Sequence, residues 1–116
     1  MELTGVLVST SAERFAAMRA FYVSTLGLHP RSDRDGFVNF DFGHSRLTVA
    51  VHSAVTGPTA DPDRIMVNLA TANIAASVDR CDPGQVVRWP EREKWGGMVA
   101  TVSDPDGNYV QFLQLE

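Results

Sequence analysis

The side chains that could carry out acid–base, nucleophilic or metal chemistry are few and widely spaced in this sequence. The three histidines, His29, His44 and His52, lie in separate segments with no paired spacing. The single cysteine, Cys81, falls near the end of an expected helix, where a small buried side chain is more common than a nucleophile. No Ser-His-Asp order, glycine-rich phosphate loop or zinc-ligand spacing occurs. The sequence therefore offers no catalytic residue, although His52 would be the candidate base if a substrate lay beside it.

Composition limits the classes of function that such a chain can serve. Its 116 residues suit one domain, and 44% hydrophobic with 21% charged residues is ordinary for a globular protein. The net charge is −4 and lysines and arginines form no cluster, so we expect no nucleic-acid partner. Apolar runs are short and the N-terminal segment lacks a signal-peptide pattern, so we expect no membrane association. A single cysteine excludes an intrachain disulfide and is typical of a reducing compartment, so we expect a cytoplasmic protein.

The N-terminal segment predicts a strand followed directly by a helix. Residues 3–8 are short, apolar and β-branched, which is typical of a strand. Thr10, with Glu13 three positions later, matches a capping box, and apolar residues then recur at three- and four-residue steps. Gly27 is placed where a residue that ends a helix would stand.

Alternating segments and turn signals complete the first half. Asp35-Gly36 predicts a hairpin turn that follows a strand between residues 28 and 32. Residues 38–42 and 46–52 alternate between apolar and polar side chains, which predicts two strands with one buried face each. The first half therefore has the order strand, helix, strand, strand, strand.

The second half repeats this order after a linker that has prolines, a glycine and no periodicity. The expected elements are a strand at 65–70, a helix capped by Thr71, and strands at 86–89, 98–102 and 109–115. We therefore expect one domain made of two modules, at about residues 1–53 and 64–116, joined by a linker at 54–63.

Two motifs carry a family resemblance. Residues 20–28 (AFYVSTLGL) are similar to an "FY…LG" helix end, and residues 103–113 (SDPDGNYVQFL) are similar to a "DPDGN…E" turn and final strand. With the doubled order of elements, they resemble the vicinal oxygen chelate superfamily of glyoxalases, bleomycin-resistance proteins and dioxygenases. The resemblance implies an α+β fold in which two βαβββ modules form a partly open, eight-stranded mixed barrel with helices outside. It says little about function, because one fold hosts unrelated activities.

In this fold one face of each strand meets the helices and the other lines a central cavity. The apolar set, which we expect to face the helices, comprises Val6, Val8, Leu47, Val49, Val51, Ile65, Val67, Leu69, Val110 and Phe112. The alternate set, which we expect to face the cavity, comprises Leu3, Gly5, Leu7, Thr48, Ala50, His52, Arg64, Met66, Asn68, Tyr109, Gln111 and Leu113. Because this second set mixes polar and apolar groups, it suits a ligand cavity better than a dry core.

Enzymes of the superfamily usually hold a divalent metal with four side chains, mostly His and Glu. The corresponding positions in this chain are Leu3, Thr48, Arg64 and Gln111. Leucine has no metal-binding atom, threonine offers only a weakly binding hydroxyl, arginine is a fixed cation, and glutamine is a neutral amide. We therefore expect no metal and no other cofactor. Glu2, His52 and Asp63 become candidate metal ligands only if the strand register is shifted.

The resemblance then favours a small organic ligand bound without metal, and sequestration of an antibiotic-like compound is one concrete form. Polar groups would orient the ligand, a guanidinium would pair with a carboxylate or phosphate, and tryptophans would stack on a planar part. The expected ligand-binding residues are Thr48, His52, Arg64, Asn68, Trp89, Trp95 and Gln111.

Two other functions stay open at this point. One is a divalent-metal-dependent lyase, isomerase or dioxygenase with a relocated metal site, so whether the chain is an enzyme is undecided. The other is a non-catalytic interaction subunit, whose cavity would be filled by its own apolar side chains. Apolar strand edges also predict a homodimer, and sequence does not say whether each cavity belongs to one chain or to two.

Overall fold

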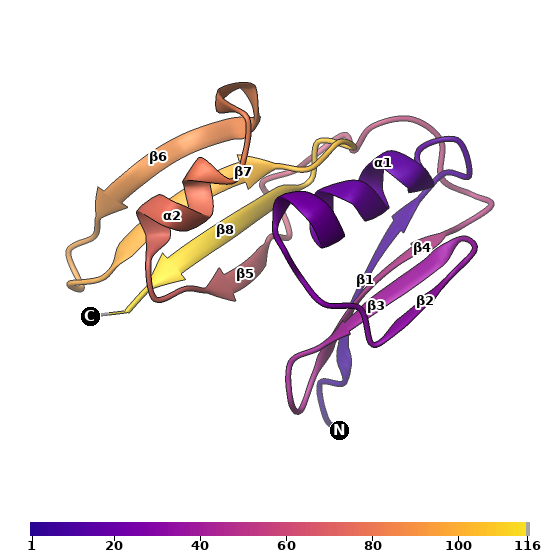
Figure 1. Cartoon of the computed structure of the whole chain (residues 1–116), viewed down its shortest axis with the longest axis horizontal. Helices are drawn as coiled ribbons and strands as arrows, with labels where there is room; N and C mark the ends of the chain where they lie inside the picture. The colour runs from indigo at the N-terminus through magenta and orange to yellow at the C-terminus, as the bar shows by residue number, and fades with distance from the viewer. Residues whose placement is uncertain (116) are drawn as a thin grey trace. The chain divides into compact units, whose positions relative to one another are not determined.

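The computed structural model describes residues 1–115, in which one order of elements occurs twice (Figure 1). Contacts divide the chain into two compact units at Gly57 and Pro58. The elements of the first unit are β1 (Gly5–Thr10), α1 (Phe15–Ala20), a π-helical turn (Phe21–Thr25), β2 (Ser32–Arg34), β3 (Phe37–Asp41) and β4 (Arg46–Val51). Those of the second are β5 (Val67–Ala70), α2 (Ile74–Asp79), a 3₁₀ turn (Pro83–Gln85), β6 (Val86–Arg92), β7 (Met98–Ser103) and β8 (Tyr109–Gln114).

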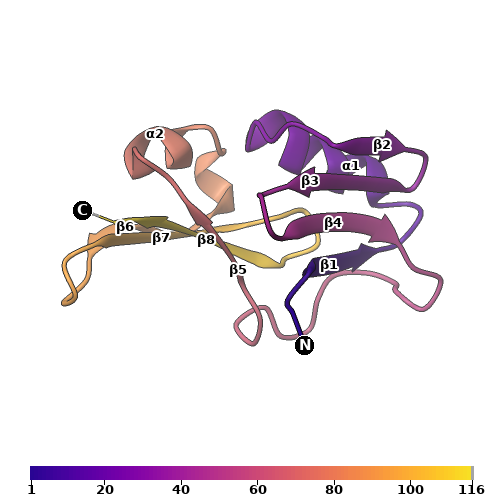
Figure 2. The ribbon, with the colours of Figure 1, turned by 90° about the horizontal axis from the view of Figure 1, so that it is seen from below.

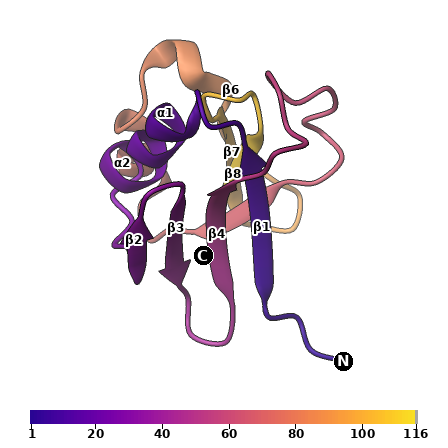
Figure 3. The ribbon, with the colours of Figure 1, turned by 90° about the vertical axis from the view of Figure 1, so that its right-hand side faces the viewer.

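Each unit contains one open, mixed, four-stranded sheet. The strand order is β1-β4-β3-β2 in the first unit, where the strands lie side by side in Figure 3, and β5-β8-β7-β6 in the second. The first strand of each unit pairs in parallel with the last, and the other pairs are antiparallel. The predicted α+β class with two βαβββ modules and eight strands is confirmed. Neither four-stranded sheet closes on itself, and open sheets are what a partly open barrel requires.

The helix of the first unit covers one face of its sheet. Met18 and Tyr22 are buried together with Val49 and Phe40 of the strands, and the Tyr22 and Phe40 ring centroids are 6.4 Å apart. At the edge strand β2, Nε of Arg19 donates to Asp33 over 2.9 Å. Burial of the apolar stripe and this ion pair together hold the helix on the sheet.

The helix of the second unit lies on one side of its sheet, which Figure 2 shows nearly edge-on. Ile74 and Val78 of α2 are buried, as are Val110 and Phe112 of β8. The side chain of Gln114, at the end of β8, accepts a hydrogen bond from the backbone N–H of Ile74 over 2.7 Å. This bond satisfies one of the N–H groups that a helix start leaves unpaired.

The predicted start of the first helix is wrong. Thr10 is the last residue of β1, where it pairs with Val51, and α1 begins at Phe15 without a side-chain cap. The carbonyl of Thr10 accepts from the N–H of His52, so strand pairing extends over residues that locally resemble a capping box. Here tertiary pairing outweighs the local capping preference of Thr10 and Glu13.

The predicted cap and first strand of the second unit also need correction. The cap of α2 is Asn73, whose side chain accepts from the N–H of Ala76 over 3.1 Å, whereas Thr71 hydrogen-bonds to Ser77. Strand β5 begins at Val67 rather than Ile65, which is 80% exposed. The pairing partner β8 determines this start, because Val67 pairs with Val110 at the first position of their parallel register.

The turn between β7 and β8 is a local hydrogen-bonded structure, as its composition predicts. The buried carboxylate of Asp104 accepts from the N–H groups of Asp106 and Asn108 over 3.0 and 2.9 Å. Gly107 has a φ of +85°, a conformation that residues with a side chain rarely adopt. Within residues 1–115, no helix is both long enough and apolar enough to pass through a membrane.

Candidate ligand-binding site

The face of the first sheet that points away from α1 carries a mixed set of side chains. Strand pairing places Leu7, Thr48 and Asn39 next to one another across β1, β4 and β3. Phe37 and Arg46 lie two positions before Asn39 and Thr48 on their own strands and therefore on the same face. Because β3 and β4 are antiparallel, they flank the row on opposite sides. We call this face the first open face.

The first open face contains a hollow of about 400 Å³. Its lining residues are Thr4, Gly5, Val6, Leu7, Phe37, Asn39, Arg46 and Thr48. This lining combines apolar groups with hydrogen-bonding groups and a single cation, and it includes no carboxylate. Such a mixture is typical of sites for small organic molecules.

The polar groups of the hollow differ in how they are held. Asn39 is buried, and its Oδ1 accepts a hydrogen bond from the backbone N–H of Ser32 over 3.0 Å. Among residues 1–115, Arg46 has neither an ion pair nor a side-chain hydrogen bond. Phe37 has the guanidinium carbon of Arg34 4.3 Å from its ring centroid, a cation–π geometry that stabilises the position of the ring.

The second sheet has an equivalent face, which we call the second open face. Its strand pairing places Asn68, Gln111, Thr101 and Arg88 in one row across β5, β8, β7 and β6. Two irregularities interrupt the pairing of β6, one on each side of Arg88. Bulges of this kind redirect side chains of an edge strand, and here they bring acidic groups to Arg88.

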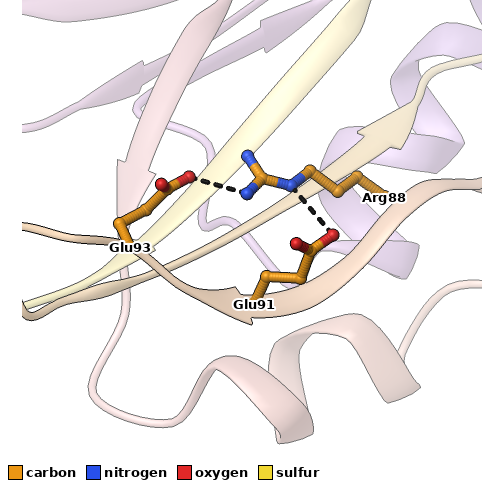
Figure 4. Close-up of polar contacts among 3 residues, drawn as sticks. All are labelled: Arg88, Glu91 and Glu93. Carbon is orange, nitrogen blue, oxygen red and sulfur yellow. Dashed lines mark hydrogen bonds and ion pairs between the residues drawn. The ribbon is translucent and has the colours of Figure 1, made fainter.

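The guanidinium of Arg88 bridges two carboxylates (Figure 4). Its Nη2 donates to Glu93 over 2.6 Å and its Nε to Glu91 over 3.3 Å. The hydrogen bond to Glu93, and then that to Glu91, raises the pKa of Arg88 above its ordinary value. Within residues 1–115, the Arg88 guanidinium is therefore paired inside its own unit, in contrast to the guanidinium of Arg46.

The structure places the sequence-predicted polar residues in different surroundings. Thr48 lines the hollow of the first open face. Asn68 and Gln111 are neighbours across β5 and β8, where Asn68 is exposed and Gln111 half-buried. The structure therefore brings these two amides together on the second open face.

The two tryptophans are both exposed. Trp89 lies on β6 with 56% of its surface exposed, and Trp95, in the β6–β7 loop, is 57% exposed. A Cβ added at Gly97 would overlap the Trp95 ring, so this ring lies directly against the Gly97 backbone. Both rings present a large apolar area to solvent.

Arg64, His52 and Leu3 are not on the strands where the sequence places them. Arg64 precedes β5, and its Nε donates to Asp61 over 2.8 Å on the surface. His52 follows β4, and its Nδ1 accepts from the N–H of Ala54 over 3.0 Å. Leu3 precedes β1 and is 77% exposed. The expected position is wrong in each case, because the start of β1, the end of β4 and the start of β5 lie one or two residues inside the predicted bounds.

The residues at the family's metal positions do not fit a divalent cation. With the observed register, the β1 residue beside Thr48 is Leu7, and the β5 residue beside Gln111 is Asn68. An aliphatic group, a hydroxyl and two neutral amides lack the carboxylate and imidazole donors that such a site requires. Within residues 1–115, no three His, Cys, Asp or Glu side chains are grouped as a metal site, and Glu2, His52 and Asp63 are no exception.

Sequence reasoning missed Arg46, Asn39 and the Arg88 cluster. Arg46 shares the alternation of Thr48, two residues away, and this period-2 signal could have identified it. The R-x-x-E-x-E spacing from Arg88 to Glu93 also offered a charge signal. Neither signal says which arginine ends up paired, because that depends on the bulges of β6.

The sequence model of the Glyoxalase/Bleomycin resistance protein/Dioxygenase superfamily matches residues 8–112. The chain belongs to this superfamily. Among curated proteins no significant sequence match is found.

Several solved structures share the fold of this chain at low sequence identity. A protein of unknown function from Agrobacterium tumefaciens str. C58 is 20% identical with a TM-score of 0.79, over 100% of this chain and 95% of that one. A glyoxalase-related enzyme from Fulvimarina pelagi is 16% identical with a TM-score of 0.78, over 99% and 88%. TnmS3, an antibiotic binding protein from Streptomyces sp. CB03234, is 23% identical with a TM-score of 0.72, over 100% and 97%. These similarities establish the fold, which enzymes and binding proteins share.

Proposed function

We propose that this protein binds a small organic molecule without a metal ion, and that sequestration of an antibiotic-like compound is its function. The observation that carries the proposal is the hollow of the first open face, with its mixed lining. The chemistry at the family's metal positions supports it, since a Lewis acid could not be held by leucine, threonine and amide groups. The antibiotic-binding neighbour TnmS3 supports it at the level of a shared fold.

The mechanism of such a protein is binding itself. Apolar burial against Leu7 and Phe37 supplies affinity, and Thr48 supplies a hydrogen bond that orients the ligand. On the second open face, Asn68 and Gln111 offer amide donors and acceptors. The exposed rings of Trp89 and Trp95 are available for stacking on a planar ligand.

The proposal is tested by titrating the protein with metal-free bleomycin and with aromatic antibiotics of positive, neutral and negative charge. Tryptophan fluorescence and calorimetry would report binding, with Trp89→Leu and Trp95→Leu as separate variants. We expect saturable binding of at least one compound, unchanged after the protein is dialysed against a chelator. Absence of binding by every compound contradicts the proposal.

The same preparation tests the metal-dependent alternative. We expect elemental analysis of protein purified without chelator to find no stoichiometric nickel, zinc, iron or manganese. A stoichiometric metal, together with loss of ligand binding after its removal, would support the metal-dependent lyase, isomerase or dioxygenase instead.

The expected homodimer and cytoplasmic location are also part of the proposal. Strand β1 is an edge of its sheet, and Val6 and Leu7 on it are exposed, so an apolar edge is available for pairing. Light scattering after size exclusion would measure the oligomeric state, and a monomer at micromolar concentration would contradict the dimer.

A further inference from the structure

The lining of the hollow is electrostatically unusual for this chain. The chain as a whole carries fourteen acidic and ten basic residues, yet Arg46 is the one charged side chain of the lining. The lining therefore offers an anion one cation and no carboxylate, although Asp41, outside the lining, lies opposite Arg46 on the same sheet face. The charge of the lining is positive, whereas the net charge of the protein is negative. The overall charge of the chain therefore does not explain the positive charge of this site.

Arg46 is also free to bind a ligand. Its register partner on β3, Asp41, has its carboxylate 3.9 Å from Nε of Arg31. Among residues 1–115, the guanidinium of Arg46 has no ion pair and no hydrogen bond. Its planar fork of N–H donors matches the two oxygens of a carboxylate.

Two further groups beside Arg46 can donate to an anion. Thr48 lies two residues away on the same strand face, about 7 Å along the strand. Asn39 is the register partner of Thr48, and its Oδ1 is already occupied by the N–H of Ser32. The NH₂ of Asn39 carries two further donors, which no hydrogen bond uses within residues 1–115, beside the second lone pair of Oδ1. The hollow therefore presents donors in excess of acceptors.

The other part of the hollow is apolar. Leu7 is 60% exposed, and Phe37 contributes an aromatic ring. Arg34 stacks on Phe37 and so stabilises the ring while adding positive charge nearby. A flat apolar group can lie against Leu7 and Phe37 while its charged end reaches Arg46.

We infer that the hollow of the first open face binds an organic carboxylate with a flat apolar body, whose carboxylate pairs with Arg46. Asn39 and Thr48 donate to the same group, and Leu7 and Phe37 contact the apolar body. The inference rests on the proposed function and adds to it the chemical class of the ligand. The whole site lies within the first unit.

The test compares 2-naphthoate with 2-naphthamide, which share a ring system and differ in charge. Both are titrated into the ¹⁵N-labelled full chain, with Arg46→Gln, Arg46→Lys and Arg88→Gln as variants, and amide shifts locate the site. We expect 2-naphthoate to shift residues of β1, β3 and β4, and Arg46→Gln to weaken it roughly tenfold. Arg46→Lys should recover part of the affinity, because it restores the charge without the fork. Arg88→Gln should leave the affinity unchanged.

The neutral ligand separates this inference from the broader proposal. If both ligands bind at the hollow with equal affinity, and Arg46→Gln changes neither, the anion specificity is wrong while small-molecule binding stands. If neither ligand binds but an antibiotic does, the inference fails in the same limited way. If no compound of either panel binds, the inference and the proposed function fail together. The ¹⁵N spectrum of each variant reports directly whether it is folded.

Discussion

Arg46 and Arg88 occupy open faces of two sheets with the same topology, but their surroundings are opposite. Arg88 is held by Glu91 and Glu93 on its own edge strand. Arg46 stands on the inner strand β4 beside a hollow, and within residues 1–115 its guanidinium has no ion pair or hydrogen bond. A guanidinium that already has two carboxylates stabilises its own strand, whereas one without a partner can exchange water for a ligand anion.

The comparison extends along equivalent rows of the two sheets. The rows are Leu7, Thr48, Asn39 and Ser32 in the first sheet and Asn68, Gln111, Thr101 and Arg88 in the second. The scaffold is repeated in its strand order and, apart from the irregularities of β6, in its register, but the side chains on its open faces are not repeated. The fold thus fixes where a ligand-binding face lies, and individual residues decide what each face binds.

The largest effect that we expect comes from filling space at the two faces. A Cβ at Gly5 would overlap the backbone carbonyl of Arg46, while one at Gly97 would overlap mainly the ring of the exposed Trp95 and lie 2.9 Å from the carbonyl oxygen of Gln114. Gly5→Ala should lower the free energy of unfolding by about 2 to 3 kcal/mol, because backbone cannot yield as a side chain can. Urea denaturation measures both variants.

Gly97→Ala should lower the free energy of unfolding by less than Gly5→Ala does. Adding Trp95→Ala to Gly97→Ala should restore part of the lost stability. Gly84→Ala is the control, since nothing lies within 4 Å of a Cβ there. Equal losses for Gly5→Ala and Gly97→Ala would show that the first open face is no more rigid than the second.

Substitutions of the two arginines should have different, smaller effects on stability. Arg88→Gln leaves Glu91 and Glu93 without their shared cation, so it should lower the urea midpoint, and less so in high salt. Arg46→Gln removes no partner within the described chain and should leave the midpoint unchanged. A loss of stability in Arg46→Gln equal to that in Arg88→Gln would remove the distinction between them.

The smallest effect concerns pH and the way each sheet holds its helix. The hydrogen bond from Arg19 lowers the pKa of Asp33 below its ordinary value near 4. A lowered folded-state pKa contributes stability above that ordinary value, and this contribution is lost as pH falls through the lowered pKa. The stability gap between wild type and Asp33→Asn should therefore shrink as the pH is taken from 7 to below 3.

Gln114→Leu provides the matched change in the second unit, where an uncharged bond holds α2. Its effect on the urea midpoint should be the same at both pH values, since no titrating group takes part in the bond. A pH-dependent effect of Gln114→Leu, or a pH-independent gap for Asp33→Asn, would contradict this account.

Local signals in the sequence were sufficient for the scaffold. Asp35-Gly36, Gly43 and the Asp104–Asn108 segment form turns through their own side chains and positive φ angles, which need no distant partner. Alternation in β4 likewise separates buried Leu47 and Val49 from Thr48. The doubled order of elements followed from such signals, and with it the family.

Tertiary structure decided the boundaries and the site. Thr10 pairs with β4 instead of capping the helix, and β5 starts where β8 can pair with it. Leu3, His52 and Arg64 therefore lie outside the strands, although counting along the chain predicts that they face a cavity. Whether an arginine has a partner depends on strand register and on bulges, which bring Glu91 and Glu93 to Arg88 and leave Asp41 nearer to Arg31 than to Arg46. Sequence spacing determines which face a side chain occupies, but only the packed strands determine which charges meet on it.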